Sequence, residues 1–182
     1  TWRLSSRHGS QGVLGDLGCH IYDMAAFLCG DIAEISCRLE TYDKGVPGGR
    51  VGEYVLDAND SMAATVTVES GVIGTIHPTR WAPPYVNREF IRVYGDKGAV
   101  EVDFARSQSA CYLYTVSAGA WQMIEAEPTP SNYERFAKAL QDGGSDESDF
   151  ANGLKVQRYL EASFASDRER KAIRIGGEAA AR

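Results

Sequence analysis

The fold class is clearest in the segment Ala63-Ala64-Thr65-Val66-Thr67-Val68-Glu69-Ser70-Gly71-Val72-Ile73-Gly74-Thr75-Ile76. Residues 63–69 are rich in β-branched side chains, a composition that favours a strand. Ser70-Gly71 is a tight-turn signal, and residues 72–76 continue as a partner strand. Two strands joined by so short a turn are antiparallel, because parallel neighbours need a long crossover. The stretch therefore predicts an antiparallel hairpin.

Further strands are predicted on both sides of this hairpin. Upstream, apolar and polar residues alternate over 34–40, as in a strand with one covered face. Residues 43–60 are rich in glycine and predict a long loop. Downstream, apolar segments separated by turn residues predict strands at 90–94, 99–104, 111–116 and 121–124.

Helical patterns occupy both ends of the chain. Apolar residues at helical spacing predict a first helix over about 14–28: Leu17, Ile21, Met24, Ala25 and Leu28. Two more helices are predicted, one behind the cap signal Ser131-Asn132 and one over 148–166, before a short strand near 172–175. This order predicts an α+β fold with one broad, mostly antiparallel open β-sheet and helices on one face. A length of 182 residues fits a single domain over 1–182.

Composition excludes several classes of partner. With 19 Lys and Arg against 25 Asp and Glu, the net charge is −6, and no basic stripe is present, so we expect no nucleic-acid partner. No apolar run approaches the roughly 20 residues of a membrane helix, so we expect no membrane partner. The four cysteines lack C-x-x-C spacing, which suits small buried residues in a reducing compartment, and we expect a cytoplasmic protein.

Three residues on the first predicted helix are candidates for acid–base catalysis. Asp16, His20 and Asp23 lie at positions i, i+4 and i+7. At about 100° per residue, the three side chains project within roughly 60° of one another. A carboxylate one turn from an imidazole can hold one ring nitrogen and leave the other to exchange a proton with a ligand. Glycines around Asp16 would let a substrate or another backbone approach closely.

The residues alone leave two other interpretations open. The same spacing occurs on ordinary helix surfaces, where charged groups form solvated ion pairs. The three side chains could also belong to a metal site, although its further ligand is not identifiable from the sequence.

The segment Gly12-Val13-Leu14-Gly15-Asp16-Leu17-Gly18-Cys19-His20-Ile21-Tyr22-Asp23 resembles the G-x-x-x-D-x-G-x-H-x-x-D signature of the glucose–fructose oxidoreductase / inositol dehydrogenase (Gfo/Idh/MocA) family. Trp2-Arg3 stands where that family often has a Trp-Arg pair, and residues 94–102 are similar to its G-x-x-G turn between strands. The tail from Phe136 also follows the family's closing pattern. The resemblance covers nearly the whole chain.

This resemblance implies a domain like the C-terminal half of glyceraldehyde-3-phosphate dehydrogenase, which supplies the substrate pocket and dimer sheet of an NAD(P)-dependent sugar or polyol dehydrogenase. It implies that His20 is the acid/base at the substrate hydroxyl and that Asp16 is its neighbour in substrate binding. Asp23 fills the last motif position. The substrate-binding candidates are Arg3, Trp2, Asp23 and Trp81.

Two departures from the family pattern matter. The family usually has three glycines before the helix, whereas this chain reads Ser10-Gln11-Gly12. The chain also lacks a G-x-G-x-x-G fingerprint and a Glu-Lys-Pro segment. We therefore expect NAD or NADP to be bound mainly by an N-terminal Rossmann domain absent from this chain, and the chain alone to be inactive. The alternatives are a non-catalytic binding or dimerisation module and, third, a metal-dependent isomerase or hydrolase.

The face of the sheet that the helices leave uncovered is a candidate surface for association with a second copy of the chain. A face that carries Val66, Val68 and Ile73 would be too apolar to leave in water. Burial against a second copy, in a homodimer or higher oligomer, would cover it, as would loops or an absent domain.

Overall fold

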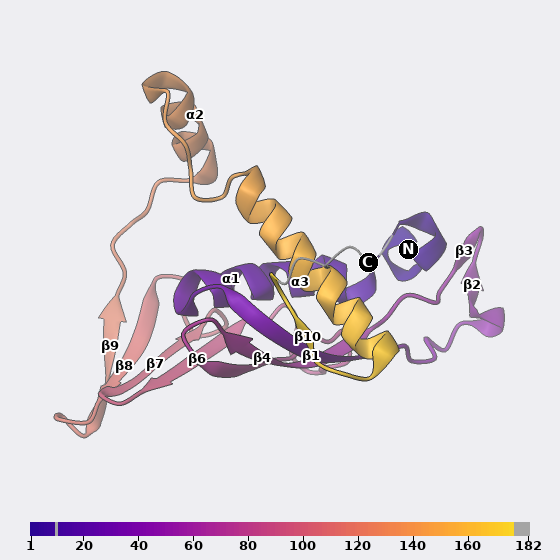
Figure 1. The fold of residues 1–182 in the computed structure, drawn as a ribbon, viewed down its shortest axis with the longest axis horizontal. Coiled ribbons are helices and arrows are strands. Elements are labelled where there is room, and N and C mark those ends of the chain that lie inside the picture. The colour runs from indigo at the N-terminus through magenta and orange to yellow at the C-terminus, as the bar shows by residue number, and fades with distance from the viewer. Residues whose placement is uncertain (10, 177–182) are drawn as a thin grey trace. The chain divides into compact units, whose positions relative to one another are not determined.

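The computed structural model describes residues 1–9 and 11–176 and is drawn in Figure 1. It divides into two compact units. Unit 1 comprises Thr1–Trp81 and the tail from Glu147, and unit 2 comprises Ala82–Asp146. Among the described residues, none of the helices combines the length and apolar character that a bilayer span requires.

Unit 1 contains a four-stranded antiparallel sheet in the order β10-β1-β4-β5. The strands are β1 (Ile32–Glu40), β4 (Ser61–Val68), β5 (Ile73–Ile76) and β10 (Ile173–Arg174). The predicted hairpin is confirmed, because Thr65 pairs with Thr75 and Thr67 with Ile73. The predicted loop contains three short elements: a 3-10 turn (Pro47–Gly49), β2 (Arg50–Val51) and β3 (Tyr54–Val55).

Helices cover one face of this sheet (Figure 1). A π-helical turn, η3 (Leu14–Gly18), runs into α1 (Cys19–Cys29), and α3 (Phe150–Glu169) returns after unit 2. Two 3-10 turns, η1 (Trp2–Leu4) and η2 (Ser6–His8), precede them. The buried core lies wholly within unit 1 and consists of Val13, Leu14, Tyr22, Ala26, Ile32, Ile35, Cys37, Met62, Ala64, Val66, Ile76, Tyr159, Leu160 and Ala162.

The buried side of the first helix matches the predicted stripe only in part. Leu28, expected to be covered, is 49% exposed, whereas Tyr22 is fully buried. The hydroxyl of Tyr22 is hydrogen-bonded to Ser163 Oγ at 2.7 Å, so its ring enters the core without an unsatisfied polar atom. The predicted stripe is therefore right for Leu17, Ile21 and Ala25, which pack against the core, and wrong for Leu28.

The helix-free face of this sheet is less apolar than the sequence suggested. Val66 and Val68 are buried in unit 1, on the same side of β4 as Met62. Of the three residues expected on the open face, Ile73 lies there and is 80% exposed, beside its register partner Thr67. The correction follows from register, since successive side chains of a strand alternate between the two faces.

Unit 2 contains a second four-stranded antiparallel sheet, in the order β6-β7-β8-β9. Its strands are β6 (Phe90–Gly95), β7 (Gly98–Asp103), β8 (Ala110–Thr115) and β9 (Ala120–Glu125). Gly98 is needed at the first turn, because a Cβ there would collide with the carbonyl oxygen of Tyr114. Helix α2 (Asn132–Asp142) follows and begins with a capping box formed by Ser131 and Glu134.

The α+β class and the antiparallel pairing are confirmed. The difference is that the hydrogen-bonded strands form two four-stranded sheets, one in each unit, together with the β2–β3 ribbon. Local strand and turn patterns identify each hairpin, but they do not say where one sheet ends and the next begins.

Candidate active site

The candidate motif lies where the π-helical turn passes into α1. Asp16 is in η3, and His20 is in the first turn of α1. π-Helical turns are rare and are frequently found at functional sites. Our angular estimate from the sequence assumed a regular α-helix, and the extra residue in this turn changes the direction in which Asp16 projects.

Asn59 anchors the start of this turn. Its backbone oxygen accepts a hydrogen bond from Val13 N at 2.9 Å, and its Oδ1 accepts one from Leu14 N at 3.0 Å. Its Nδ2 donates to Gln11 O at 2.9 Å. Gly12 has φ +65°, and a Cβ at that position would lie 2.6 Å from Asn59 O. The expectation that a motif glycine permits the close approach of another backbone is confirmed at this residue.

Asp16 is held by two guanidinium groups. Arg3 Nε lies 3.1 Å from Oδ1, and Arg80 Nη2 donates to Oδ2 at 2.7 Å. The backbone of Arg80 is itself fixed, because its N–H donates to Asp60 O at 2.9 Å. These contacts differ from the expected arrangement, in which Asp16 would orient His20.

Asp23 is also engaged elsewhere. Its Oδ1 accepts a hydrogen bond from Asn152 Nδ2 at 2.7 Å, which joins α1 to α3. In the described part of the chain, neither Asp16 nor Asp23 is hydrogen-bonded to the imidazole of His20. His20 is exposed. Its side chain is therefore open to a ligand from solvent, and the two carboxylates are engaged by other groups.

The two tryptophans predicted for substrate binding lie beside the arginines that hold Asp16. The guanidinium of Arg3 lies 5.2 Å from the ring centroid of Trp2. Trp81 follows Arg80 in the chain, and its ring is edge-on to Tyr42, with centroids 5.9 Å apart. Both tryptophans are 50% exposed, so each offers a free ring surface.

The structure thus brings Arg3 and Asp16 into direct contact and places Trp2 against Arg3. Arg80 was missed by sequence reasoning. Its one local signal is the neighbouring Trp81, whereas its contact with Asp16 joins residues 64 positions apart.

The chain's residues fit neither a metal ion nor a dinucleotide in the part that the structure describes. Within the described residues, no group of three or more His, Cys, Asp or Glu side chains could hold a metal ion. A dinucleotide is bound by a parallel βαβ unit with a glycine-rich turn. The paired strands of both sheets are antiparallel, and the sequence has no such fingerprint, so these residues do not fit the dinucleotide.

The chain is similar in sequence to a known protein family and to several curated proteins. The family model described as "GFO/IDH/MocA C-terminal domain" matches residues 1–101. Levoglucosan dehydrogenase of Pseudarthrobacter phenanthrenivorans is 24% identical over 193 aligned positions, covering 86% of this chain and 50% of the relative. D-Apiose dehydrogenase of Rhizobium rhizogenes is 21% identical, covering 92% of this chain and 50% of the relative. The chain spans about half the length of these curated relatives.

Solved structures share the fold. Levoglucosan dehydrogenase in complex with NADH and levoglucosan matches with a TM-score of 0.86 and 20% identity, over 98% of this chain and 54% of that one. An oxidoreductase domain protein from Kribbella flavida matches with a TM-score of 0.78 and 26% identity, over 96% and 54%. Because the family model extends from the Trp2-Arg3 pair through the Asp16/His20 helix to β7, the chain belongs to the GFO/IDH/MocA family and contains its C-terminal domain.

Proposed function

We propose that this chain is the substrate-binding and oligomerisation half of an NAD(P)-dependent sugar or polyol dehydrogenase, with His20 as the acid/base. Membership of the family supports the proposal. So do the relatives, which are named as dehydrogenases of levoglucosan and D-apiose. The observation that carries it is the exposed imidazole of His20 one turn from Asp16, a carboxylate held by Arg3 and Arg80.

The proton step falls to His20. Oxidation of a C–OH group removes a proton from oxygen as hydride leaves carbon, so a base must come within hydrogen-bond reach of the hydroxyl. An imidazole exchanges protons near neutral pH, and that of His20 is accessible to a ligand. His20 accepts the hydroxyl proton in oxidation and returns it in the reverse reaction.

Asp16 orients the substrate. Each carboxylate oxygen can accept about two hydrogen bonds, and each oxygen of Asp16 uses one on an arginine. The remaining acceptor positions suit hydroxyl groups of a sugar. Trp2 and Trp81 supply ring surfaces for its apolar face, and Arg3 holds both Asp16 and Trp2 in place.

The cofactor belongs to a part of the parent enzyme outside this chain. Because the residues described here do not fit a dinucleotide, we assign NAD or NADP to a Rossmann domain of the parent. Bound there, the cofactor would supply the hydride acceptor. The isolated chain has no turnover in this proposal, and NAD(P)-linked turnover or tight dinucleotide binding by the 182 residues alone would contradict it.

The proposed protein is a cytoplasmic oligomer. Ile73, 80% exposed on the helix-free face of unit 1, supports a homodimer or higher oligomer through an open sheet face. The cysteines Cys19, Cys29, Cys37 and Cys111 are free thiols, which supports a reducing, cytoplasmic location.

One observation favours a second candidate, a non-catalytic binding module. Asp16 and Asp23 are both engaged by structural partners, and neither is hydrogen-bonded to His20 in the described residues. A family member that had lost the reaction could keep these contacts, because they hold the helix in place.

Substitution of His20 in the full-length parent separates the two candidates. His20→Ala should lower kcat about 10²- to 10⁴-fold with levoglucosan or D-apiose and NAD(P), since general acid–base catalysis contributes that much. NAD(P)H formation followed by absorbance is the measurement. His77→Ala is the matched control, because His77 is an exposed histidine of the same unit outside the motif. Equal turnover of the two variants would sink the catalytic role and leave the binding module.

A further inference from the structure

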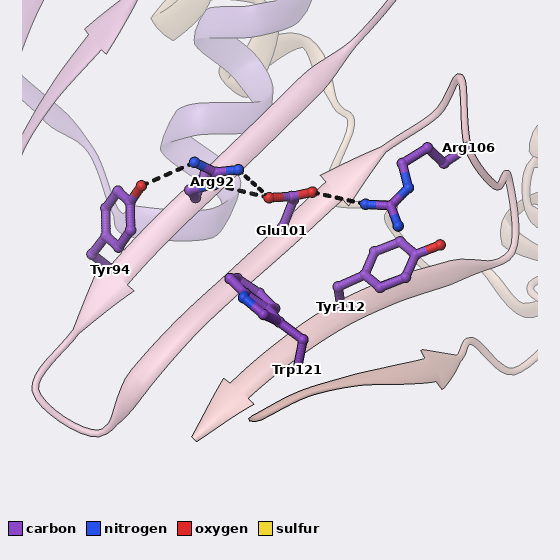
Figure 2. A pocket seen from close by; sticks show the side chains of 6 residues that line it. All are labelled: Arg92, Tyr94, Glu101, Arg106, Tyr112 and Trp121. Carbon is purple, nitrogen blue, oxygen red and sulfur yellow. Dashed lines mark hydrogen bonds and ion pairs between the residues drawn. The ribbon is translucent and has the colours of Figure 1, made fainter. Parts of the chain in front are cut away.

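A cavity lies on one face of the unit 2 sheet, among residues that the proposed reaction does not use (Figure 2). Its volume is about 450 Å³, within the range of pockets for small ligands. Six side chains line it: Arg92, Tyr94, Glu101, Arg106, Tyr112 and Trp121. Register explains the gathering, since Arg92 pairs with Glu101 and Glu101 with Tyr112 across adjacent strands.

Glu101 forms the polar centre of this cavity. It is only 8% exposed, and its carboxylate lies between two guanidinium groups (Figure 2). Arg92 donates from Nε at 2.9 Å and also from Nη2, and Arg106 donates from Nη1 at 3.2 Å. Because each arginine is held by the same carboxylate, donors and acceptor keep fixed positions before any ligand arrives.

The arginines are held by aromatic residues as well. Arg92 Nη1 donates to the hydroxyl of Tyr94 at 3.2 Å, and the guanidinium of Arg106 lies 4.0 Å from the ring centroid of Tyr112. The hydrogen bond to Tyr94, and to a smaller extent the one to Glu101, raises the pKa of the Arg92 guanidinium. Of the three nitrogens of Arg106, only Nη1 is used in the contacts of the described residues, so the other two can bind a ligand.

Large aromatic surfaces border this polar centre. Tyr94 is 73% exposed and Trp121 is 48% exposed. The ring of Trp121 contacts that of its cross-strand partner Tyr114, with centroids 5.6 Å apart. A ligand that fits must therefore be flat and apolar on one side and rich in hydrogen-bonding groups at its edge.

We propose that this cavity binds a sugar ring, stacked on Trp121, with its hydroxyls on Glu101 and Arg106. A sugar hydroxyl both donates and accepts, so neighbouring hydroxyls can donate to the carboxylate and accept from the guanidinium. The C–H face of the ring matches the indole surface. The two arginines and one glutamate carry a net charge of only +1, which suits a sugar better than a polyanion.

This site does not depend on the proposed reaction. All six lining residues belong to unit 2, whereas His20, Asp16 and their partners belong to unit 1. A second copy of the chain is the rival occupant, because exposed Trp, Tyr and Arg are typical of protein interfaces. The hollow favours the small ligand, since a second copy would need a protruding group to fill it.

The indole N–H signals of the 182-residue chain test the proposal. The chain has three tryptophans: Trp2 and Trp81 flank the Asp16 site, and Trp121 reports on this cavity. We expect D-glucose and levoglucosan to shift the Trp121 signal saturably in ¹H–¹⁵N NMR spectra. Glycerol, which has no ring face, should leave it in place. Shifts confined to Trp2 and Trp81 would assign sugar binding to the other site and overturn the proposal.

Substitutions of the lining residues show which side chains contribute to sugar binding. Trp121→Ala should weaken sugar binding about tenfold or more through loss of the stacking surface, measured by calorimetry. Glu101→Gln should weaken it by removing an anionic acceptor while keeping the side chain's shape. Gln122→Ala is the matched control, since Gln122 neighbours Trp121 on β9 and pairs with Leu113 on the opposite face. Unchanged Trp2 and Trp81 signals verify that unit 1 remains folded.

Two further outcomes would overturn the inference. Wild-type affinity in Trp121→Ala would show that sugar binds elsewhere. A Trp121 signal that depends on protein concentration and not on sugar, with a dimer in sedimentation, would assign this face to a second copy.

Discussion

The two four-stranded sheets have the same antiparallel pairing but are held together differently. The sheet of unit 1 lies under α1 and α3, and the buried apolar cluster consists entirely of unit 1 residues. The buried residues of the unit 2 sheet are small or acidic: Ala99, Glu101, Asp103 and Ala110. Similar strand patterns in the sequence therefore occur in one unit built on an apolar core and in another whose sheet buries carboxylates paired with partly exposed arginines.

The two units should therefore lose stability in response to different changes. Apolar burial depends on volume and little on pH, so unit 1 should respond to changes in side-chain size. Ion pairs depend on charge, so unit 2 should respond to protonation. Substitutions at Tyr22, Asp103 and Arg80 test this difference.

Truncation of Tyr22 should break unit 1. Tyr22 is fully buried, and its hydroxyl is hydrogen-bonded to Ser163. We expect Tyr22→Ala to lower the free energy of unfolding by about 3–5 kcal/mol, the usual cost of emptying a large aromatic site. Urea unfolding followed by far-UV circular dichroism measures this loss. Tyr22→Phe keeps the volume and should lose only about 1 kcal/mol for the hydrogen bond. Equal losses in the two variants would contradict a core held by packing.

Acid should act on unit 2 through Asp103. Its buried carboxylate accepts from Arg88 Nη2 at 2.6 Å, and this hydrogen bond holds the pKa of Asp103 below its usual value. A lowered folded-state pKa means that Asp103 contributes stability above its unfolded pKa of about 3.9. That contribution is lost as pH falls through the lower, folded-state pKa.

The measurement is the urea concentration at which half of the Trp121 indole N–H signal of the folded state is lost. It is determined at a series of pH values from neutral down to about 2. Asp103→Asn should lower the midpoint at neutral pH and flatten its fall in acid. Asp96→Asn, in the exposed turn between β6 and β7, is the control and should retain the wild-type slope. A variant Asp103→Asn with an unaltered acid slope would show that this pair does not hold unit 2.

The smallest effect on stability is expected at Arg80. The Arg80–Asp16 pair is partly exposed, so Arg80→Ala should cost about 0.2–1 kcal/mol in unfolding free energy. In the full-length parent, the same change should lower kcat/KM about tenfold, because Asp16 would lose its fixed orientation toward the substrate. Arg80→Lys restores the charge without the planar group and should recover part of the activity. A stability loss larger than the activity loss would make Arg80 a structural residue only.

Much of the fold could be predicted, because the relevant signals are local. The β-branched residues and the Ser70-Gly71 turn act within a few positions, and the observed β4 and β5 lie where they predict. The third helix was predicted over 148–166 and is observed as Phe150–Glu169. The buried side of α1 was predicted in part: Ile21 and Ala25 pack against the core, but the burial of Tyr22, whose hydroxyl is hydrogen-bonded to Ser163 on that distant helix, was missed.

The candidate site could be predicted only in part. Motif spacing identified Asp16, His20 and Asp23, and resemblance added Arg3 and the two tryptophans. Their catalytic and binding roles remain proposals. The clamp of Arg80 on Asp16 could not be found from spacing, because the contact depends on how the segment after β5 packs beside the helix.

The α+β class, the hairpins and the family motif follow from local sequence, because turns, alternation and motif spacing are properties of neighbouring residues. Three features follow only from the packed chain: the strands form two sheets, Asp16 is held by Arg3 and Arg80, and a glutamate between two arginines forms the centre of a cavity. These features are contacts between residues far apart in the chain. Such contacts arise from packing and register, which no short stretch of sequence contains.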